Sequence, residues 1–268
     1  MRQKFYQTEK FQSIFFPVLY LLLSIGIVIT GCVIFYNNYY QKILVDGISM
    51  KPTLIGGGSA HASVDGIPVY YRYHYGIADL HQSAVNKLNR FDVCVTYYPQ
   101  AWPTEDGASI IKRVWGFPGE TLKLTYNAEN REFTYTVSKN DKLLCEYKAP
   151  VVEITRKYEA EYKKNGQRKF TTVSETFNAA EFNVGNKIFY TNVATSSYRT
   201  FTKTLQSNEY FVMGDNWDGS SDSYTNITKT DLLTKKYIQG RAVCISGYAS
   251  SQGNKAVDIH KTNKRYKF

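Results

Sequence analysis

A lysine on the apolar face of a predicted strand is the first side chain that could do chemistry. In the segment SIIKRVWGFPGE, residues 109–120, strand alternation puts Lys112 on the same face as Ile110 and Val114. Burial disfavours the charged ammonium, so the pKa of such a lysine falls from about 10.4 and its neutral amine can activate a serine hydroxyl. Taken alone, the segment fits an edge-strand lysine that reaches water better than a buried base.

Two further segments hold serines and carboxylates in predicted turns. In VDGISMKPTL, residues 45–54, glycine and proline force a turn around Ser49. The segment YFVMGDNWDGSSDS, residues 210–223, carries Ser220 and Asp222. Taken singly, Ser49 is most simply an ordinary turn serine.

Several other catalytic classes are disfavoured by what the sequence lacks. The histidines, at positions 61, 74, 81 and 260, have no HExxH spacing, and no serine lies in GxSxG. These absences disfavour a zinc peptidase and a Ser-His-Asp hydrolase. We predict that His74 and His81 are surface residues rather than metal ligands.

The cysteines give no sign of a metal site. They lie at positions 32, 94, 145 and 244, without a CxxC or Cys/His pattern. We predict buried free thiols at Cys94 and Cys244, and neither a metal nor a cofactor. One disulfide outside the cell stays possible, although Cys94, Cys145 and Cys244 cannot all pair.

Together the three segments resemble the signature boxes of type I signal peptidases, the Ser/Lys enzymes that remove signal peptides from exported proteins. GISMKPTL, residues 47–54, resembles the nucleophile box, in a form similar to that of Gram-positive enzymes. KRVWGFPGE, residues 112–120, resembles the general-base box, and GDNWDGSSDS, residues 214–223, resembles the last box. Residues 90–93, RFDV, match a fourth box more weakly, and the order along the chain is that of the family.

The resemblance implies a role for each matched residue. Ser49 would be the nucleophile, Lys112 the general base, and Ser220 the hydroxyl that orients the lysine amine. Asp215, Asp222 and Arg113 would support the site, with Asp222 paired to Arg113. The backbone N–H of Ser49 would hold the oxyanion. Many relatives add a hydroxyl donor two positions before the nucleophile, and Gly47 leaves that second donor open.

The chain departs from the family pattern at three positions. Trp217 and Tyr224 stand where arginines are common, and Glu120 replaces the usual aspartate. None of these changes touches Ser49 or Lys112, so we expect an active enzyme.

The substrate implied by the resemblance is the signal peptide of an exported preprotein. An extended peptide could add to the strand at residues 109–112 by β-augmentation. Shallow apolar pockets that accept alanine at the −1 and −3 positions would be walled by Val45, Met50, Ile110 and Ile111. Two alternatives stay open: a specialised relative that processes or assembles pilins, and a non-catalytic, membrane-anchored assembly factor on the same fold.

An uncharged run before these segments predicts a membrane anchor. Residues 14–36 contain no Asp, Glu, Lys, Arg or His, and as a helix they would be about 35 Å long, enough to cross a bilayer. Residues 1–13 carry Arg2, Lys4 and Lys10 against Glu9, which predicts a cytoplasmic N-terminus. We therefore predict a single-pass protein of the bacterial cell membrane, with its catalytic part outside.

The rest of the chain has the composition of a strand-rich folded protein. With 15% aromatic residues, 18 Gly and 7 Pro, the sequence is neither disordered nor collagen-like. Of the net charge of +10, about +8 lies outside the predicted anchor and N-terminus, which favours approach to anionic lipid headgroups, although a general role in solubility stays open. A membrane-anchored external domain is a poor reader of nucleic acid. Strands are predicted at residues 67–75, 91–98, 109–115, 121–126, 132–137, 187–191, 209–213 and 237–245.

These strands predict a mainly β fold, a sandwich or barrel, and the resemblance implies that it is signal-peptidase-like. The predicted catalytic β core comprises residues 40–126 and 205–250, with an inserted β subdomain at 127–204 and a basic C-terminal tail at 251–268. Residues 56–59, GGGS, are predicted to be a flexible loop within the core.

Overall fold

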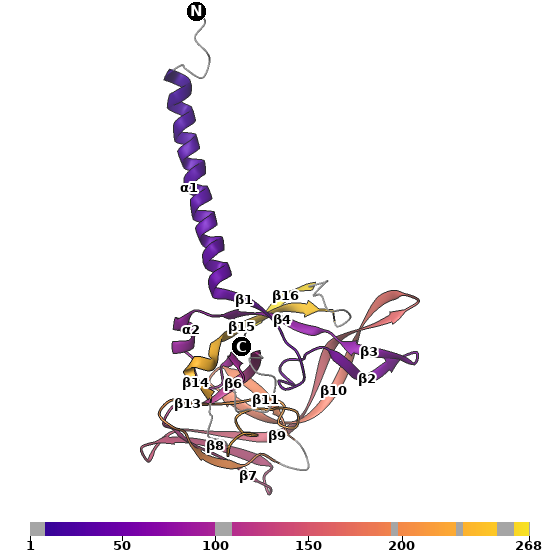
Figure 1. Cartoon of the computed structure of the whole chain (residues 1–268). Helices are drawn as coiled ribbons and strands as arrows, with labels where there is room; N and C mark the ends of the chain where they lie inside the picture. The colour runs from indigo at the N-terminus through magenta and orange to yellow at the C-terminus, as the bar shows by residue number, and fades with distance from the viewer. Residues whose placement is uncertain (1–8, 100–108, 194–197, 229–232, 251–259, 268) are drawn as a thin grey trace, which may run out of the picture. The chain divides into compact units, whose positions relative to one another are not determined.

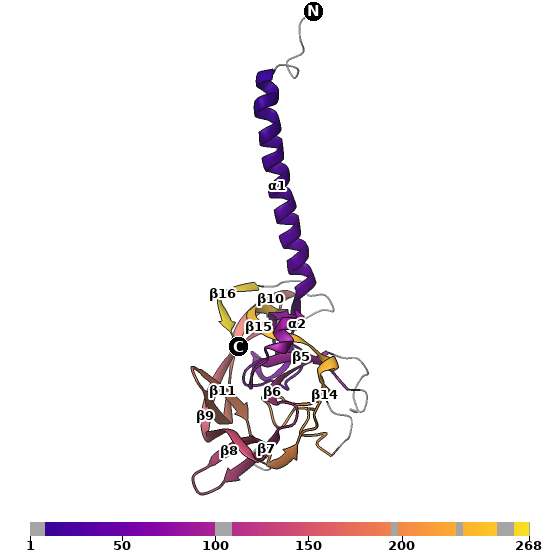
Figure 2. The ribbon, with the colours of Figure 1, turned by 90° about the vertical axis from the view of Figure 1, so that its left-hand side faces the viewer.

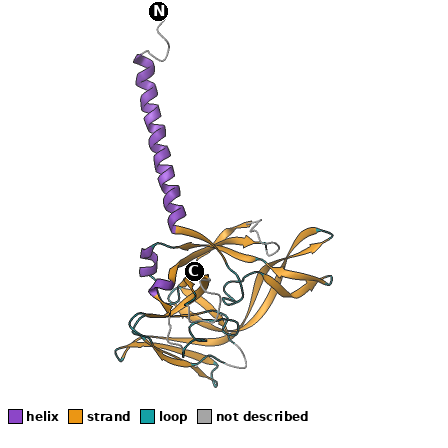
Figure 3. Cartoon of the chain, in the orientation of Figure 1, coloured by secondary structure: helices purple, strands orange, loops and turns teal. Residues whose placement is uncertain are grey.

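The computed structural model describes residues 9–99, 109–193, 198–228, 233–250 and 260–267. The chain forms two compact units, Met1–Gln41 and Lys42–Phe268. Apart from α1, the described helices are two short turns, α2 and η2, and strands dominate (Figure 3). The predicted mainly β fold, preceded by one apolar helix, is confirmed. Residues 1–8 and 251–259, which include Arg2, Lys4 and half of the predicted basic tail, lie outside the described residues.

The first unit is dominated by the helix α1, Glu9–Tyr39. Its apolar part, Phe11–Tyr39, is the one described helix long and apolar enough to cross a membrane. It extends beyond the predicted run 14–36 because the flanking polar and aromatic residues continue the same helical hydrogen bonding. Pro17 lies inside the helix, as membrane helices tolerate.

The first sheet of the second unit contains β6, which begins the segment 112–120, while the segments 47–54 and 214–223 lie in turns that follow β1 and β13. Figure 1 shows the arrangement of its strands. Its strand order is β1-β4-β15-β5-β6-β13-β14, and β16 pairs with β15. The strands are β1 Tyr40–Leu44, β4 Tyr73–Asp79, β5 Val93–Tyr97, β6 Ser109–Gly116, β13 Glu209–Met213, β14 Leu233–Thr234, β15 Ile238–Ala249 and β16 His260–Lys267. The short helices are α2 Gln82–Asn86 and η2 Lys235–Tyr237.

The second sheet has the order β11-β10-β9-β8-β7-β12, and β3 joins β2 to β9. Its strands are β2 Gly58–Val64, β3 Ile67–Tyr71, β7 Thr121–Asn127, β8 Glu132–Lys139, β9 Lys142–Lys164, β10 Gln167–Val184, β11 Lys187–Asn192 and β12 Phe201–Thr204. Within this sheet, the long β9–β10 ribbon reaches the β2–β3 hairpin, which pairs with β9 (Figure 1). Figure 2 shows β7, β8, β9 and β11 of the same sheet from a second side. The region 127–204 therefore shares its sheet with β2 and β3, and its status as a separate domain stays a prediction.

An aromatic core joins the two sheets. Trp115 of β6 is fully buried and meets Phe91 edge-on, with ring centroids 5.1 Å apart. From the second sheet, Phe182 and Phe189 stack on each other at 5.0 Å and pack against the same two rings. Burial of these large rings stabilises the packing of one sheet on the other. Because Lys112 lies on the same strand as Trp115, this core also fixes the strand that carries the lysine.

Two local predictions, for residues 56–59 and for His74, are wrong. Residues 56–59 are not a flexible loop: the Gly56 N–H donates to the Gly47 carbonyl at 2.8 Å, and a methyl group at Gly56 would overlap the Gly47 backbone. His74 is buried rather than on the surface, and its Nδ1 accepts a hydrogen bond from the Ile55 N–H at 3.1 Å. Both errors concern residues whose neighbours come from other parts of the chain.

Candidate active site

Ser49 lies in a tight turn between β1 and β2. The Lys51 N–H donates to the Ile48 carbonyl at 3.1 Å, and the Leu54 N–H donates to the Met50 carbonyl at 2.9 Å. Gly47 has a φ of +75°, which a glycine adopts without strain. The turn is held down by apolar burial of Met50 and Leu54, each 1% exposed. Ser49 itself stays partly exposed above them.

Lys112 reaches this serine from β6. Its Nζ lies 2.7 Å from the Oγ of Ser49, in hydrogen-bond contact, and the residue is only 2% exposed. β6 is flanked by β5 and β13, and Lys112 faces Cys94 of β5 across the ladder. The alternative of a lysine that reaches water is therefore wrong, because Lys112 is buried and its amine contacts Ser49.

Burial lowers the pKa of Lys112 to about 8. Nearby charges modify that effect: Asp222 and Asp215 raise the pKa, while Arg199 lowers it. Burial also raises the pKa of the Cys94 thiol to about 12, so that neighbour stays neutral. A large share of the lysine is thus in the neutral form near pH 8, in contact with a hydroxyl that could give it a proton.

The third segment lies against the serine turn. The Asn216 N–H donates to the Ser49 carbonyl at 3.0 Å, and its side-chain Nδ2 donates to the Ile48 carbonyl at 3.1 Å. The Ser220 Oγ is buried, makes no hydrogen bond within the described residues, and lies against Gly214 together with the Ser49 carbonyl. The structure thus places Ser220 beside the backbone of Ser49, without the hydrogen bond to the Lys112 amine that the resemblance implies.

The predicted pairing of Asp222 with Arg113 is wrong. Arg113 instead pairs with Asp215, with its Nε 2.8 Å from Oδ1. Asp222 pairs with Arg199, whose guanidinium donates to both carboxylate oxygens at 3.0 and 2.8 Å. Arg199 was not among the predicted site residues because it lies outside every box, in an unremarkable Ser-Tyr-Arg-Thr stretch.

Arg90, in the segment that matches a fourth box more weakly, contacts residues that follow Lys112 in the chain. Arg90 pairs with Glu120 at 2.8 Å and donates to the Trp115 carbonyl. A carboxylate at position 120 therefore has a partner even though glutamate replaces aspartate there. These contacts brace the strand that carries Lys112.

A cavity of about 360 Å³ is lined by Ser49 and Lys112 among other residues. The four residues predicted to wall substrate pockets all line it, namely Val45, Met50, Ile110 and Ile111. β13 pairs with β6 only as far as Arg113, so among the described residues the edge of β6 opposite β5 carries no strand at residues 109–112. An extended peptide could pair with this edge and place side chains in the cavity.

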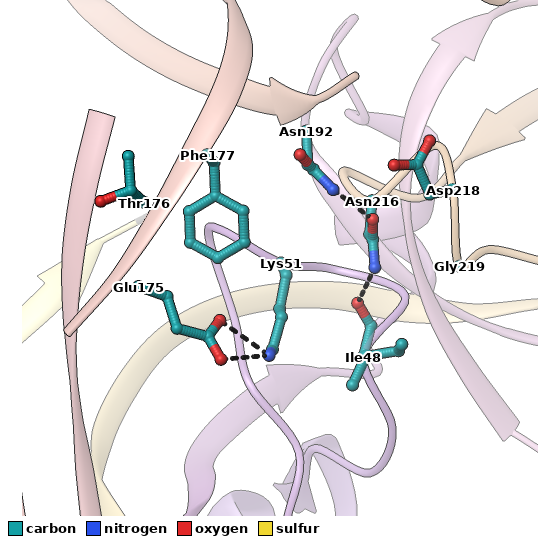
Figure 4. A pocket seen from close by; sticks show the side chains of 9 residues that line it. All are labelled: Ile48, Lys51, Glu175, Thr176, Phe177, Asn192, Asn216, Asp218 and Gly219. Atoms are coloured by element: carbon teal, nitrogen blue, oxygen red, sulfur yellow. Dashed lines mark hydrogen bonds and ion pairs between the residues drawn. The ribbon is translucent and has the colours of Figure 1, made fainter. Parts of the chain in front are cut away.

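A second cavity, of about 430 Å³, shares Ile48 and Gly219 with the first (Figure 4). Here Lys51, two residues after Ser49, pairs with Glu175 of β10 at 2.9 Å. The Tyr71 hydroxyl also donates to Glu175. The ribbon of the second sheet is thus tied directly to the serine turn.

None of the four cysteines forms a disulfide, and Cys94 and Cys244 are buried, as predicted for free thiols. Among the described residues, no group of three or more His, Cys, Asp or Glu side chains is arranged to hold a metal ion.

Two comparisons relate the chain to known proteins. A family model described as signal peptidase, peptidase S26, matches residues 18–246. The chain is also 28% identical over 229 residues to a protein of Pseudomonas aeruginosa named signal peptidase I. That match covers 82% of this chain and 64% of the Pseudomonas protein, so the chain spans less than two thirds of its relative.

Proposed function

The chain belongs to the signal peptidase family, peptidase S26, and we propose that it is a membrane-anchored serine endopeptidase that cleaves N-terminal signal peptides from exported preproteins. Ser49 is the nucleophile and Lys112 the general base. The observation that carries this assignment is the 2.7 Å contact between a serine hydroxyl and a lysine amine that is almost fully buried. A buried, neutral amine is a competent base for a hydroxyl.

The Lys112 Nζ carries the proton in both halves of the reaction. As the Ser49 Oγ attacks the scissile carbonyl, its proton passes to the Lys112 Nζ, and the Ser49 N–H stabilises the oxyanion. The lysine ammonium then gives that proton to the leaving amine of the mature protein, which leaves an ester on Ser49. Water then attacks this ester while Lys112 takes its proton, and the ammonium returns that proton to the Ser49 Oγ as the ester bond breaks and the signal peptide leaves as a carboxylate.

Specificity follows from the cavity and from the free edge of β6. The signal peptide pairs in extended form with residues 109–112, and alternate side chains then point into the cavity. Val45, Met50, Ile110 and Ile111 leave room for alanine at −1 and −3 and clash with larger side chains. Each substrate is therefore read mainly by size.

The apolar helix α1 is proposed to anchor the enzyme with its N-terminus in the cytoplasm. Substrates then meet the site on the outer face of the bacterial cell membrane. The basic balance of the chain, +10 overall, favours contact with anionic lipid at that surface. A purely structural assembly factor has no need of a lysine buried against a serine, so the catalytic role is preferred.

Cleavage of a preprotein by the purified full-length chain in detergent tests this function. A preprotein with alanine at −1 and −3 is expected to yield the mature chain, identified by the mass of its new N-terminus. Ser49→Ala and Lys112→Ala are each expected to lower the rate by roughly 10³-fold or more. Lys123→Ala, on the exposed face of β7, serves as the matched control and is expected to leave the rate unchanged. Full activity in either site variant would contradict the assignment.

A further inference from the structure

Arg199 lies between β11 and β12, outside the segments that resemble catalytic boxes, and is 5% exposed. Besides its two hydrogen bonds to Asp222, its guanidinium donates to the Trp217 carbonyl at 2.7 Å and to the Ser220 carbonyl at 3.1 Å. The Arg199 side chain, which comes from the segment between two strands of the second sheet, therefore binds three residues of the loop that carries Ser220. Charge-assisted hydrogen bonds of this kind fix geometry strongly.

Tyr224 contacts both members of the Arg199–Asp222 pair. Tyr224 stands where arginines are common in the resemblance, and its backbone N–H donates to Asp222 at 3.0 Å. Its ring lies against the Arg199 guanidinium, whose central carbon is 4.6 Å from the ring centroid. A guanidinium carried by residue 224 could therefore reach the carboxylate that Arg199 now binds.

We propose that Arg199 is a positioning residue of the reaction: it fixes the Ser220 loop and balances the charge of Asp222 beside Lys112, in place of an arginine within the loop. This role rests on the proposed function, because it acts on the proposed base. The guanidinium touches neither the substrate cavity nor the reacting atoms, so its effect passes through Asp222 and the loop.

The charges around Lys112 determine the direction of that effect. The charged groups are Asp222 and Asp215 of the loop and Arg199. The Cys94 thiol on β5 also lies nearby, but it is neutral. Asp215 is already balanced by Arg113, so Arg199 is the partner that offsets Asp222. Without Arg199, the Asp222 carboxylate favours the Lys112 ammonium, and the pKa of Lys112 rises. Without the Asp222 charge, Arg199 alone lowers that pKa.

The test is the pH dependence of kcat/KM for preprotein cleavage by full-length variants. For Arg199→Met, the acid-side midpoint is expected to move up by about one pH unit, and for Asp222→Asn it is expected to move down. The double variant, which loses both charges, is expected to return close to the wild-type midpoint. Lys164→Met, which removes an exposed cation at the far end of the β9–β10 ribbon, is the control and is expected to leave the midpoint unchanged.

A rescue variant separates positioning from general destabilisation. Adding Tyr224→Arg to Arg199→Met is expected to restore both the midpoint and at least half of the lost rate. A uniform loss of rate with an unchanged midpoint would overturn the proposal, as would shifts of the same sign in Arg199→Met and Asp222→Asn. If Arg199→Met does not fold, an unchanged or raised midpoint in Asp222→Asn overturns it. Failure of the wild-type chain to cleave at any pH would instead refute the proposed function.

Discussion

Burial turns an ordinary lysine into a candidate base at Lys112. Strand alternation in the sequence placed this residue on an apolar face, but it could not decide between a buried strand and an edge strand. Burial of the side chain decides it: Lys112 is almost fully buried and its amine contacts Ser49, which comes from a distant part of the chain. Arg199 could not be found at all from the sequence, because an arginine gives no local signal of the carboxylate that it meets in space.

Gly214 is a residue where the addition of a single methyl group is expected to lower activity strongly. A methyl group there would overlap both the Ser220 hydroxyl and the Ser49 carbonyl, and the backbone carbonyl cannot turn aside. Gly214→Ala is therefore expected to lower preprotein cleavage by about 100-fold through displacement of the serine turn. The measurement is kcat/KM on the full-length chain.

Gly166 supplies the control for that variant. It lies in the β9–β10 turn with φ of +74° and open space around it. Gly166→Ala is expected to cost about 1 kcal/mol of stability and to keep full activity. Equal activity in the two alanine variants would contradict the close approach inferred at Gly214.

At the scale of elements, the serine turn is held from two directions. The loop after β13 binds it through Asn216, and the ribbon strand β10 binds it through the Glu175–Lys51 pair. The sequence predicted β structure in region 127–204 but gave no hint of this contact. The alternating charged and apolar residues of β9 and β10 define which side chains share a face, and they do not say which part of the molecule that face meets.

The Glu175–Lys51 pair is expected to stabilise the active form of the serine turn. Both side chains are largely buried, at 11% and 18% exposure. A double-mutant cycle in kcat/KM with Lys51→Met and Glu175→Gln should give a coupling energy of about 1 kcal/mol. The exposed Lys164–Asp65 pair at the far end of the ribbon is the control, and its cycle should show no coupling. Additive effects of Lys51→Met and Glu175→Gln would show that the ribbon does not act on the turn through this pair.

At the scale of the whole molecule, the sequence predicted the architecture well because the signals for it extend over many consecutive residues and do not depend on contacts with distant parts of the chain. An uncharged run predicts a spanning helix, and alternating strands predict a β fold, without knowledge of tertiary partners. Family membership also followed from short boxes in a fixed order. The pairing of the strands in residues 58–71 with the ribbon had no such signal. These strands pair with residues about 90 positions later in the chain, and the path of the chain between them is not written in either segment.

The proposed orientation of α1 gives a prediction for the intact chain. A protease added to cells without their outer wall should digest the unit Lys42–Phe268 and leave the region of α1 protected. Replacement of Arg2, Lys4 and Lys10 by glutamate should increase the protected share of the Lys42–Phe268 unit. Survival of that unit in the wild-type chain until the cells are lysed would contradict the orientation.

The most direct test of the Ser49–Lys112 pair is the pH dependence of kcat/KM for cleavage of a preprotein by the full-length enzyme. Because only the neutral amine accepts the serine proton, the rate should fall about tenfold per pH unit on the acid side of the midpoint. That midpoint should lie near the Lys112 pKa of about 8. A profile that stays flat between about pH 5 and pH 9 would contradict the assignment of Lys112 as the base.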